Sequence, residues 1–431
     1  MKRVHTNDLP ANSGARVRLA GWVHHQRHLA HISFLLLRDA GGIAQVVLEG
    51  LAIRAMALEL LPETVIEVVG TVTASSQAPG GIEIHDPEIH VLSATTSPPP
   101  FELRRPQLNA QLPQLLDHAA VSLRHPRVRG GLEISAASVL GFRSTLDSLG
   151  FTEIHTPKIV GAATESGANV FAIDYFGKPA YLAQSPQLYK QMMVGVFERV
   201  YETGPVFRAE PHDTVRHLAE YLSLDVELGF IEDHRDVEAV VRDVLEGMIT
   251  AVATHAAPAI ALLGLDLPVV PAEIPRVDFV EALLLVEEAT GERRAGEPDL
   301  APSDERWLSD WALKEHGSEF LFVEGYPMVK RPFYTHPMPS RPECSNSFDL
   351  LFRGLELVTG GQRLHRHADY LAVLDEETQI ALSGYLEAFR HGMPPHGGFA
   401  IGLERWTARL VGARNIREVT AFPRDLNRLS P

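Results

Sequence analysis

Short runs of alternating apolar and polar residues fill the first hundred positions, and this period of two is typical of β-strands. The runs that fit a strand are residues 17–24, 31–38, 43–48, 65–72 and 82–92, and a helix-like stretch, LAIRAMALELL, follows the third of them. Five strands with one helix after the third is the order of an OB-fold barrel, whose strand face and loops bind oligonucleotides. The pattern therefore predicts an N-terminal OB-fold β-barrel with single-stranded nucleic acid as its ligand.

Aromatic and polar side chains on such a barrel are candidates for contacts with bases. A base stacked on an aromatic ring is stabilised by roughly 1–3 kcal/mol, and Phe34 is a candidate for this role beside Arg27 and Gln45. Packing into the barrel core is the competing role of an aromatic residue. We favour the core for Trp22 and leave both roles open for Phe34.

A proline-rich segment, SPPPFELRRPQ, ends the barrel near residue 100, and its consecutive prolines predict an extended, stiff spacer. Beyond it, long amphipathic helices such as 132–149 and 236–253 alternate with strand pairs such as RVYETGPVFRAE and YLSLDVELGFIE. We expect an α+β protein in which residues 1–100 form the OB-fold domain, 101–125 a hinge, and 126–431 a second domain with an antiparallel sheet flanked by helices.

Composition limits the class of protein. The chain has 431 residues, 45% of them hydrophobic, which is enough for about two to three domains. A net charge of -16 excludes a protein that coats nucleic acid by bulk charge, although a local basic surface is predicted within residues 1–38. No apolar run approaches the roughly 20 residues of a membrane span, so we expect a cytoplasmic protein without a membrane partner. The single cysteine, Cys344, excludes an internal disulfide.

The common nucleotide-binding signatures, a GxxxxGK[ST] loop and a GxGxxG turn, are absent from the sequence, as is a HExxH helix. Phosphates must therefore be bound by other groups, and the planar fork of arginine suits them. The segment GPVFRAEPHDTVRHLAEYLSLDVELGF carries charges on one face of each of two predicted strands and in the loop between them: Arg208, Glu210, Arg216, His217, Asp225 and Glu227. These charges suit a nucleotide, and the solvated side of a sheet is the alternative.

A second segment, SFDLLFRGLELVTGGQRLHR, predicts a hairpin. Asp349 and Glu356 lie on either side of its turn, where two carboxylates suit Mg²⁺, an ion that takes one or two carboxylates together with substrate phosphates. Thr359 follows, before a Gly-Gly pair that lets backbone come close to a ligand and leads to Arg363. A solvated hairpin without a ligand is the alternative here.

Two shorter segments add weaker signals. HGGFAIGLERWTARLVG predicts a glycine-rich strand that runs into a helix beginning near Leu403, and Arg405 adds charge to a helix N-terminus that already favours anions. In QSPQLYKQ, Gln187 and Lys190 lie one turn apart on one face of a predicted helix and can hold a small polar ligand together.

These four segments, in this order behind an N-terminal barrel, resemble the class II aminoacyl-tRNA synthetases, and within subclass b the aspartyl enzymes of the archaeal type. FTEIHTPKI, which includes Pro157, is similar to the first family motif, FRAE with the HDTVRHL loop to the second, and GLER to the third. Residues 230–342 leave no room for the large domain that bacterial aspartyl enzymes carry there. The resemblance implies a class II catalytic domain at 126–431, ATP as substrate, Mg²⁺ as cofactor, and a homodimer whose interface includes Pro157.

The resemblance also implies roles for individual residues. Arg208 would hold the α-phosphate and the amino-acid carboxylate, Glu210 the adenine amine, and Arg405 the γ-phosphate. The full ATP-binding set that the resemblance implies is Arg208, Glu210, Arg216, His217, Leu218, Glu356, Glu404, Arg405, Trp406 and Thr407. The aspartate-binding set is Glu165, Ser185, Gln187, Lys190, Arg208, Asp225, Thr359 and Arg363. The metal-binding set is Asp349, Glu356 and Thr359.

Substrate identity depends on Lys190 and Arg363, because two cations meet the extra negative charge that distinguishes aspartate from asparagine. We expect both cations to be desolvated with no carboxylate to pair them, so that a neutral amide is rejected. Asparaginyl relatives lack the lysine, and lysyl relatives need an acidic pocket. Three alternatives stay open: an asparaginyl-tRNA synthetase, an amide-forming enzyme for free asparagine, and an RNA-binding module that has lost its catalytic site.

The range of tRNA substrates depends on the barrel. Archaeal-type aspartyl enzymes are either strict for tRNA(Asp) or relaxed, so that they also charge tRNA(Asn). His28, in the predicted loop after the first strand, and Pro79, between the fourth and fifth, lie where relatives of the two kinds differ. The anticodon residues are therefore Arg27, His28, Phe34, Gln45 and Pro79, and the sequence resembles the relaxed kind. A tRNA-dependent amidotransferase downstream is a further partner that this interpretation leaves open.

Overall fold

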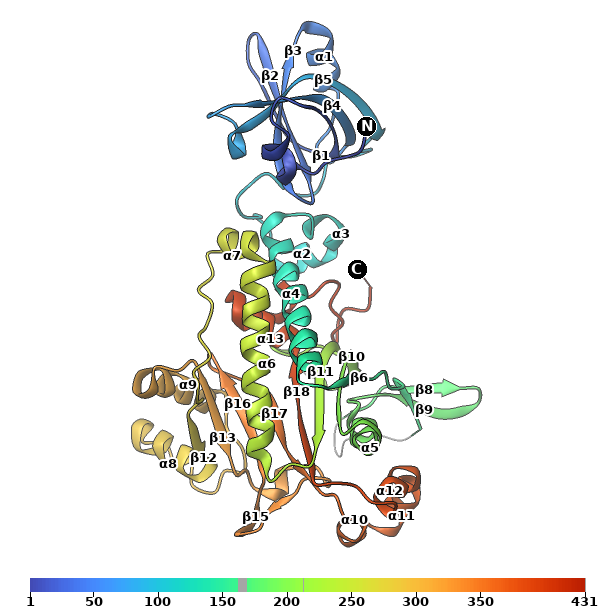
Figure 1. The fold of residues 1–431 in the computed structure, drawn as a ribbon, viewed down its shortest axis with the longest axis vertical. Coiled ribbons are helices and arrows are strands. Elements are labelled where there is room, and N and C mark those ends of the chain that lie inside the picture. The colour runs from blue at the N-terminus through green and yellow to red at the C-terminus, as the bar shows by residue number, and fades with distance from the viewer. Residues whose placement is uncertain (162–168, 212, 431) are drawn as a thin grey trace. The chain divides into compact units, whose positions relative to one another are not determined.

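The computed structural model describes residues 1–161, 169–211 and 213–430. It divides into two compact units, Met1–His125 and Pro126–Pro431 (Figure 1). Each unit is held by its own hydrophobic core.

The first unit is built around a closed barrel with strand order β1-β2-β3-β5-β4. Its strands are β1 (Arg16–His28), β2 (Ile32–Asp39), β3 (Gly42–Glu49), β4 (Val65–Ala74) and β5 (Ile82–Ser93), and α1 (Leu51–Leu58) follows β3. Leu19, Val23, Leu35 and Leu37 point into the barrel core, as the period of two requires. The predicted OB-fold is confirmed, with each strand within a few residues of its expected range.

The segment after the barrel packs within the first unit rather than forming a free hinge. It contains the short helices α2 (Leu112–Asp117) and α3 (Ala119–Ser122). Arg124 Nη1 donates to Glu63 Oε2 at 3.1 Å, and His125 Nε2 lies 2.8 Å from the carbonyl oxygen of Arg105. Glu63 is buried and also accepts two hydrogen bonds from Arg38, so it joins this segment to the barrel.

The second unit contains an eight-stranded sheet with the order β12-β13-β16-β17-β18-β11-β10-β6. Its strands are β6 (Thr152–Glu153), β10 (Arg199–Phe207), β11 (Glu220–Gly229), β12 (Arg276–Asp278), β13 (Phe320–Glu324), β16 (Ser347–Phe352), β17 (Leu355–Arg363) and β18 (His396–Gly402). The six central strands pair antiparallel, as predicted. The two edge strands, β12 and β6, pair parallel with their neighbours, because helix-containing crossovers connect each pair.

Two long helices, α4 (Pro126–Ser148) and α6 (His234–His255), cover one face of this sheet (Figure 1). On β11, Leu224, Val226 and Leu228 belong to the core beneath the helices. Strand alternation therefore turns Asp225 and Glu227 to the opposite face. That face is flanked by α5 (Gln187–Phe197), which contacts β10 and β11.

Smaller elements complete the second unit. They are α7 (Ala257–Leu263), α8 (Phe279–Thr290), α9 (Pro302–His316), α10 (His367–Val373), α11 (Glu376–Ala381), α12 (Ser383–Arg390), α13 (Leu403–Val411), β7 (Ile159–Val160), β8 (Ala172–Tyr175), β9 (Lys178–Leu182), β14 (Pro337–Met338) and β15 (Arg341–Ser345). Within the described residues no single helix is long and apolar enough to cross a membrane. The bent pair α6 and α7 meets the length and composition test only when the two helices are taken together, across an 87° bend.

Candidate active site

A cavity of about 350 Å³ opens on the sheet face that the long helices leave uncovered. Six cationic and four anionic side chains line it, which gives a positive site in a protein of net charge -16. Segments more than 200 residues apart in sequence meet here. The predicted residues in its lining are Ser185, Gln187, Lys190, Arg208, Glu210, Arg216, His217, Leu218, Asp225, Glu356, Thr359, Arg363, Glu404 and Arg405.

Lys190 is the most enclosed cation of the cavity, with 1% of its surface exposed. Its position on α5 directs the ammonium to the sheet, where Nζ lies 3.0 Å from Asp225 Oδ1 and 3.3 Å from Glu227 Oε2. It also donates to the backbone carbonyl oxygens of Val226 and Phe399. These contacts fix one positive charge at the cavity wall.

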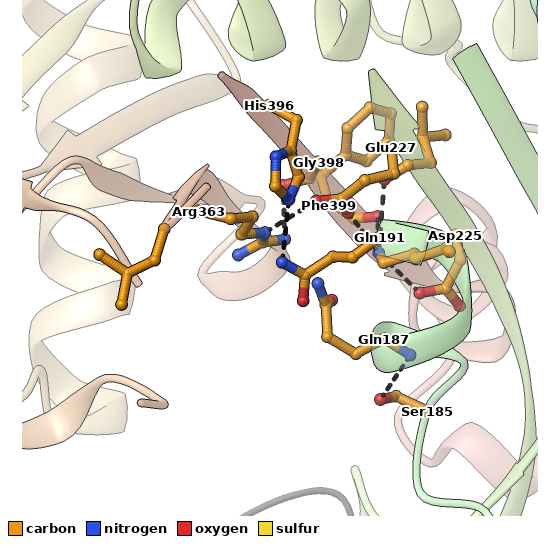
Figure 2. Close-up of polar contacts among 12 residues, drawn as sticks. Ser185, Gln187, Gln191, Asp225, Glu227, Arg363, His396, Gly398 and Phe399 are labelled. Atoms are coloured by element: carbon orange, nitrogen blue, oxygen red, sulfur yellow. Dashed lines mark hydrogen bonds and ion pairs between the residues drawn. The ribbon is translucent and has the colours of Figure 1, made fainter. Parts of the chain in front are cut away.

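Glu227 joins the two cations that were predicted to select the substrate. It is fully buried, and its Oε1 accepts from Arg363 Nε at 3.1 Å (Figure 2). Its Oε2 lies 3.3 Å from Lys190 Nζ. Coulombic attraction to Arg363 and Lys190 outweighs the effect of burial and lowers the pKa of Glu227. The expectation that no carboxylate pairs these cations is therefore wrong, because β11 places Asp225 and Glu227 on the same face as both.

A glycine on β18 makes this arrangement possible. A Cβ at Gly398 would stand 2.0 Å from Glu227 Oε2 and 2.1 Å from the carbonyl oxygen of Val226. Arg363 Nη2 donates to the carbonyl oxygen of Gly398 at 2.9 Å. The glycine-rich strand that the sequence singled out thus leaves room for a buried carboxylate, rather than only for a flat ligand.

Three buried polar residues that the sequence did not single out, His396, Gln191 and Tyr385, form a hydrogen-bonded chain beside this cluster. Burial lowers the pKa of His396 to about 4, so its ring is neutral and Nδ1 donates to Pro394 O at 2.8 Å. The other ring nitrogen, Nε2, accepts from Gln191 Nε2 at 3.0 Å (Figure 2). Tyr385 donates to Gln191 Oε1. The only sequence signal for Gln191 is its place one residue after Lys190, which by itself favours no role.

The other end of the cavity carries arginines on separate elements. Arg208 follows β10, with its guanidinium carbon 5.8 Å from the centre of the Tyr221 ring. Arg405 lies in the first turn of α13, and Arg216 Nη1 pairs with Glu305 Oε2 at 3.2 Å. Glu305 lies in the first turn of α9 and was not predicted. Arginines spread around a cavity in this way can contact several phosphates at once.

The hairpin of β16 and β17 carries the predicted metal ligands. Glu356 and Thr359 line the cavity, and Thr359 donates to Glu356 Oε1 at 3.1 Å. Asp349 is buried behind them and accepts two hydrogen bonds from Arg331, at 3.1 and 3.3 Å. Burial raises the pKa of Asp349 to about 6, opposed by Arg331 and increased by Glu356. Two interacting carboxylates suit a divalent cation, and Arg331, which the sequence did not single out, supplies part of the balancing charge.

Trp406, Thr407 and Pro157 are predicted residues that, like Asp349, do not line the cavity. The side chains of Trp406 and Thr407 do not reach it: both are 0% exposed, Trp406 Nε1 donates to Ser138 Oγ, and Thr407 donates to the carbonyl oxygen of Leu403. On α13, Glu404 and Arg405 face the cavity, and helical periodicity turns the next two residues, Trp406 and Thr407, into the core. Glu165 lies outside the described residues. Pro157 is exposed between β6 and β7.

Glu404 is a buried carboxylate at the start of α13 that anchors β11. Its two oxygens lie 3.1 and 3.2 Å from the backbone nitrogen of Leu222. Burial raises the pKa of Glu404 from 4.5 to about 7, partly offset by the Leu222 hydrogen bond. The folded protein therefore holds this proton more tightly than the unfolded chain does. Its contribution to stability is full below pH 4.5, falls as the pH rises to 7, and is constant above that.

Replacing Glu404 by glutamine keeps an oxygen acceptor for Leu222 and removes the titration. We expect the free energy of unfolding of Glu404→Gln, relative to the parent protein, to rise by up to about 3 kcal/mol between pH 5 and pH 8. Denaturant unfolding of both proteins at the two pH values measures this difference. An equal difference at pH 5 and pH 8 would contradict the assignment of a raised pKa.

The predicted anticodon residues lie on the barrel of the first unit. Arg27 Nη2 donates to Gln45 Oε1 at 2.8 Å, and its guanidinium carbon is 5.5 Å from the centre of the Phe34 ring. Phe34 is half-buried on the outer face. His28, the last residue of β1, has Nδ1 3.0 Å from Ser33 Oγ. Pro79 begins a short 3-10 helix between β4 and β5.

The core position expected for Trp22 is wrong. Leu19 and Val23 point into the barrel, so the period of two places Trp22 on the outer face, where it is half-buried. The Arg38 guanidinium carbon lies 5.8 Å from the centre of its ring.

Comparison with known families and proteins gives a consistent result for both units. A family model described as "OB-fold nucleic acid binding domain" matches residues 17–92, and one described as "tRNA synthetases class II (D, K and N)" matches residues 112–426. The chain is 48% identical to the "Aspartate--tRNA(Asp/Asn) ligase" of Thermus thermophilus, with 100% of each chain covered. It is 47% identical to the protein of the same name from Deinococcus radiodurans, over 100% of this chain and 99% of the relative.

Solved structures with the same fold include both asparaginyl-tRNA and aspartyl-tRNA synthetases. An asparaginyl-tRNA synthetase from Pyrococcus horikoshii, complexed with asparaginyl-adenylate, superposes with a TM-score of 0.93 at 30% identity, with both chains fully covered. A putative aspartyl-tRNA synthetase from Leishmania major gives a TM-score of 0.88 at 28% identity, over 100% of this chain and 95% of that one. Backbone similarity alone therefore does not separate aspartate from asparagine. Together, the matched family model and the full-length relatives show that this chain belongs to the class II tRNA synthetases (D, K and N).

Proposed function

We propose that the protein attaches L-aspartate to tRNA(Asp), and also to tRNA(Asn), with ATP as the energy source. The observation that carries the choice of amino acid is the cluster of Lys190, Arg363, Asp225 and Glu227 at one end of the cavity. Full-length relatives at 47% and 48% identity carry the name "Aspartate--tRNA(Asp/Asn) ligase", which supports the same activity.

A charge count explains why aspartate fits this cluster. Lys190 and Arg363 bring two positive charges, and Glu227 neutralises one of them. Asp225, which contacts Lys190 in this structure, is assigned to the α-ammonium group of the bound amino acid. When Asp225 pairs with that group, one positive charge is left for the substrate side chain. The carboxylate of aspartate supplies the matching negative charge. Asparagine would leave a buried cation without compensation, and lysine would add a further positive charge.

The reaction proceeds in two steps without a protein nucleophile. An oxygen of the aspartate α-carboxylate attacks the α-phosphorus of ATP, and the bond to the bridging oxygen breaks to release pyrophosphate. The terminal ribose hydroxyl of tRNA then attacks the aspartyl carbonyl carbon, AMP leaves, and the hydroxyl proton passes to solvent. Arg208, which follows β10, and Arg405, on α13, both line the cavity and stabilise the charge that develops on the phosphates.

Magnesium would be held at the phosphate end of the site by Asp349, Glu356 and Thr359. The interacting carboxylates of Asp349 and Glu356, with Thr359 beside them, form an oxygen donor set that suits this ion. When bound, Mg²⁺ would neutralise phosphate charge. The residues of the chain do the positioning: Arg331 orients Asp349, and Thr359 orients Glu356.

Relaxed tRNA specificity rests on His28 and Pro79, at the end of β1 and between β4 and β5. Aspartylation of separate tRNA(Asp) and tRNA(Asn) transcripts, at one fixed salt concentration, tests it directly. We expect labelled aspartate on both transcripts. Charging of tRNA(Asp) alone would reduce the function to that of a strict aspartyl enzyme.

Phe34 provides a test of the barrel as the anticodon-binding surface. Phe34→Ala removes a stacking platform worth roughly 1–3 kcal/mol, so we expect the KM for tRNA to rise by about 10- to 100-fold. Aspartate-dependent ATP–pyrophosphate exchange does not use the anticodon and should be unchanged. Leu58→Ala, an exposed change on α1 of the same barrel, is the control. Equal tRNA kinetics for the two variants would rule out a stacking role for Phe34.

Three further proposals accompany this function. We infer a homodimer whose interface includes the exposed Pro157, cytoplasmic action on free tRNA, and, where tRNA(Asn) carries aspartate, a tRNA-dependent amidotransferase that converts the product to the asparaginyl form. Sedimentation of the purified protein tests the first of these, and a monomer at micromolar concentration would contradict it.

A further inference from the structure

A second cluster of ionisable side chains lies on the sheet face opposite the substrate cavity. His234 begins α6, Glu238 lies one turn further along the same helix face, and Glu324 ends β13. One ligand atom from each of the three lies within 4.8 Å of the other two. The residues are only 4%, 1% and 8% exposed, so the cluster is buried where α6 begins on the sheet.

The polar atoms of this cluster are poorly satisfied. Within the part of the chain that the structure describes, neither ring nitrogen of His234 has a hydrogen-bond partner, nor has Oε1 of Glu238 or of Glu324. The closest approach of the imidazole is 3.5 Å, from His234 Nε2 to Glu324 Oε2, which is an ion-pair distance without hydrogen-bond geometry. A buried polar group left without a partner costs about 1–3 kcal/mol, so several of them together call for a ligand.

The positive charge near Glu238 and Glu324 is carried by two partly exposed arginines, Arg276 and Arg235. Arg276 Nε lies 2.6 Å from Glu238 Oε2 and 3.3 Å from Glu324 Oε1, and its side chain is 39% exposed. Arg235 is 63% exposed and lies 3.6 Å from Glu324. Both arginines are partly exposed, so neither is fixed in the buried interior of the cluster.

We propose that His234, Glu238 and Glu324 form a binding site for one divalent transition-metal ion, with Zn²⁺ the best match. A neutral imidazole and two carboxylates are ligands that Zn²⁺ takes, whereas Mg²⁺ prefers an all-oxygen set. Bonds of about 2.0–2.2 Å to each ligand atom require the three side chains to draw slightly together. The ion satisfies the imidazole and the unpaired carboxylate oxygens, and water completes its coordination.

The site is structural rather than catalytic. It joins the first turn of α6 to the end of β13, and the adjacent strand β16 carries Asp349 on the other face of the sheet. Arg276 contacts the same two carboxylates, so it competes with the metal for their negative charge. The partly exposed Arg276 can turn into solvent when the ion binds.

Metal titration of the full-length protein tests the proposal independently of aminoacylation. The protein is stripped with a chelator, supplied with millimolar Mg²⁺ to occupy the phosphate site, and titrated with Co²⁺ or Zn²⁺. We expect one tightly bound equivalent per chain, visible with Co²⁺ as ligand-field absorption of a nitrogen-containing site. The absence of a bound equivalent in the parent protein would overturn the proposal whatever the variants do.

Variants locate the ion within the chain. His234→Gln and Glu238→Gln should each lose that equivalent, whereas His391→Gln should keep it, because His391 directly follows α12 and pairs there with Glu387 on the surface. Arg276→Gln removes the competing cation and should tighten metal binding several-fold. An equivalent that persists in both His234→Gln and Glu238→Gln, or weaker binding by Arg276→Gln, would overturn the assignment.

Discussion

Arg208→Gln is expected to lower aspartate-dependent ATP–pyrophosphate exchange by about 10²- to 10³-fold, the usual cost of removing one preorganised charge donor. Arg208 enters the cavity from the end of β10 and is the one residue assigned to both the α-phosphate and the substrate carboxylate. Its loss should therefore reduce kcat and kcat/KM together, because the interaction strengthens as charge develops on the phosphate.

The matched control is Arg366→Gln. Arg366 is an exposed arginine that pairs with Asp369 on the surface, where an ion pair contributes little. We expect exchange by this variant to stay within a factor of two of the parent protein. Comparable activity of the two variants would remove Arg208 from the catalytic site.

Glu227→Gln is expected to damage both stability and substrate selection. The fully buried carboxylate pairs with Lys190 and Arg363, and removing one partner of such a network costs about 3–5 kcal/mol of unfolding free energy. Glu227 normally neutralises one of the two charges of Lys190 and Arg363, and the substitution removes that neutralising charge next to the substrate. The ratio of kcat/KM for aspartate over asparagine should change by at least about tenfold, since a shift of 1.4 kcal/mol suffices for this.

Glu202→Gln separates these two effects. Glu202 is a buried carboxylate on the neighbouring strand β10, where it pairs with Lys158 at 2.8 Å and does not line the cavity. Its replacement should lower stability but leave the aspartate-to-asparagine ratio unchanged. If both variants show the same ratio as the parent protein, Glu227 acts only in folding.

The alternation of apolar and polar residues is enough to predict individual strands and helices and the side chains that share one face of them. The period of two predicts the five barrel strands and a shared face for Asp225 and Glu227 on one strand, and both predictions are confirmed. The parallel pairing of β6 with β10 and of β12 with β13 could not be predicted in this way, because it depends on crossover connections rather than on residue alternation.

The misses at the site have two physical origins: contacts between elements that are distant in sequence, and the local geometry of a helix or an irregular segment. Glu227 was visible as a charge beside Asp225, but its partners come from α5 and β17, so its pairing of both cations depends on the folded sheet. Arg331 comes from an irregular segment with no periodicity to interpret. Trp406 follows two cavity residues in sequence, yet the helix turns it into the core.

Amino-acid-dependent ATP–pyrophosphate exchange shows which amino acid the cavity activates, because it reports adenylate formation without any tRNA. Purified protein with ATP and Mg²⁺ is supplied in turn with aspartate, asparagine and lysine at equal concentrations. The charge balance at Lys190, Arg363, Asp225 and Glu227 predicts rapid exchange with aspartate and background exchange with the other two. Exchange with asparagine equal to or faster than that with aspartate would contradict the account.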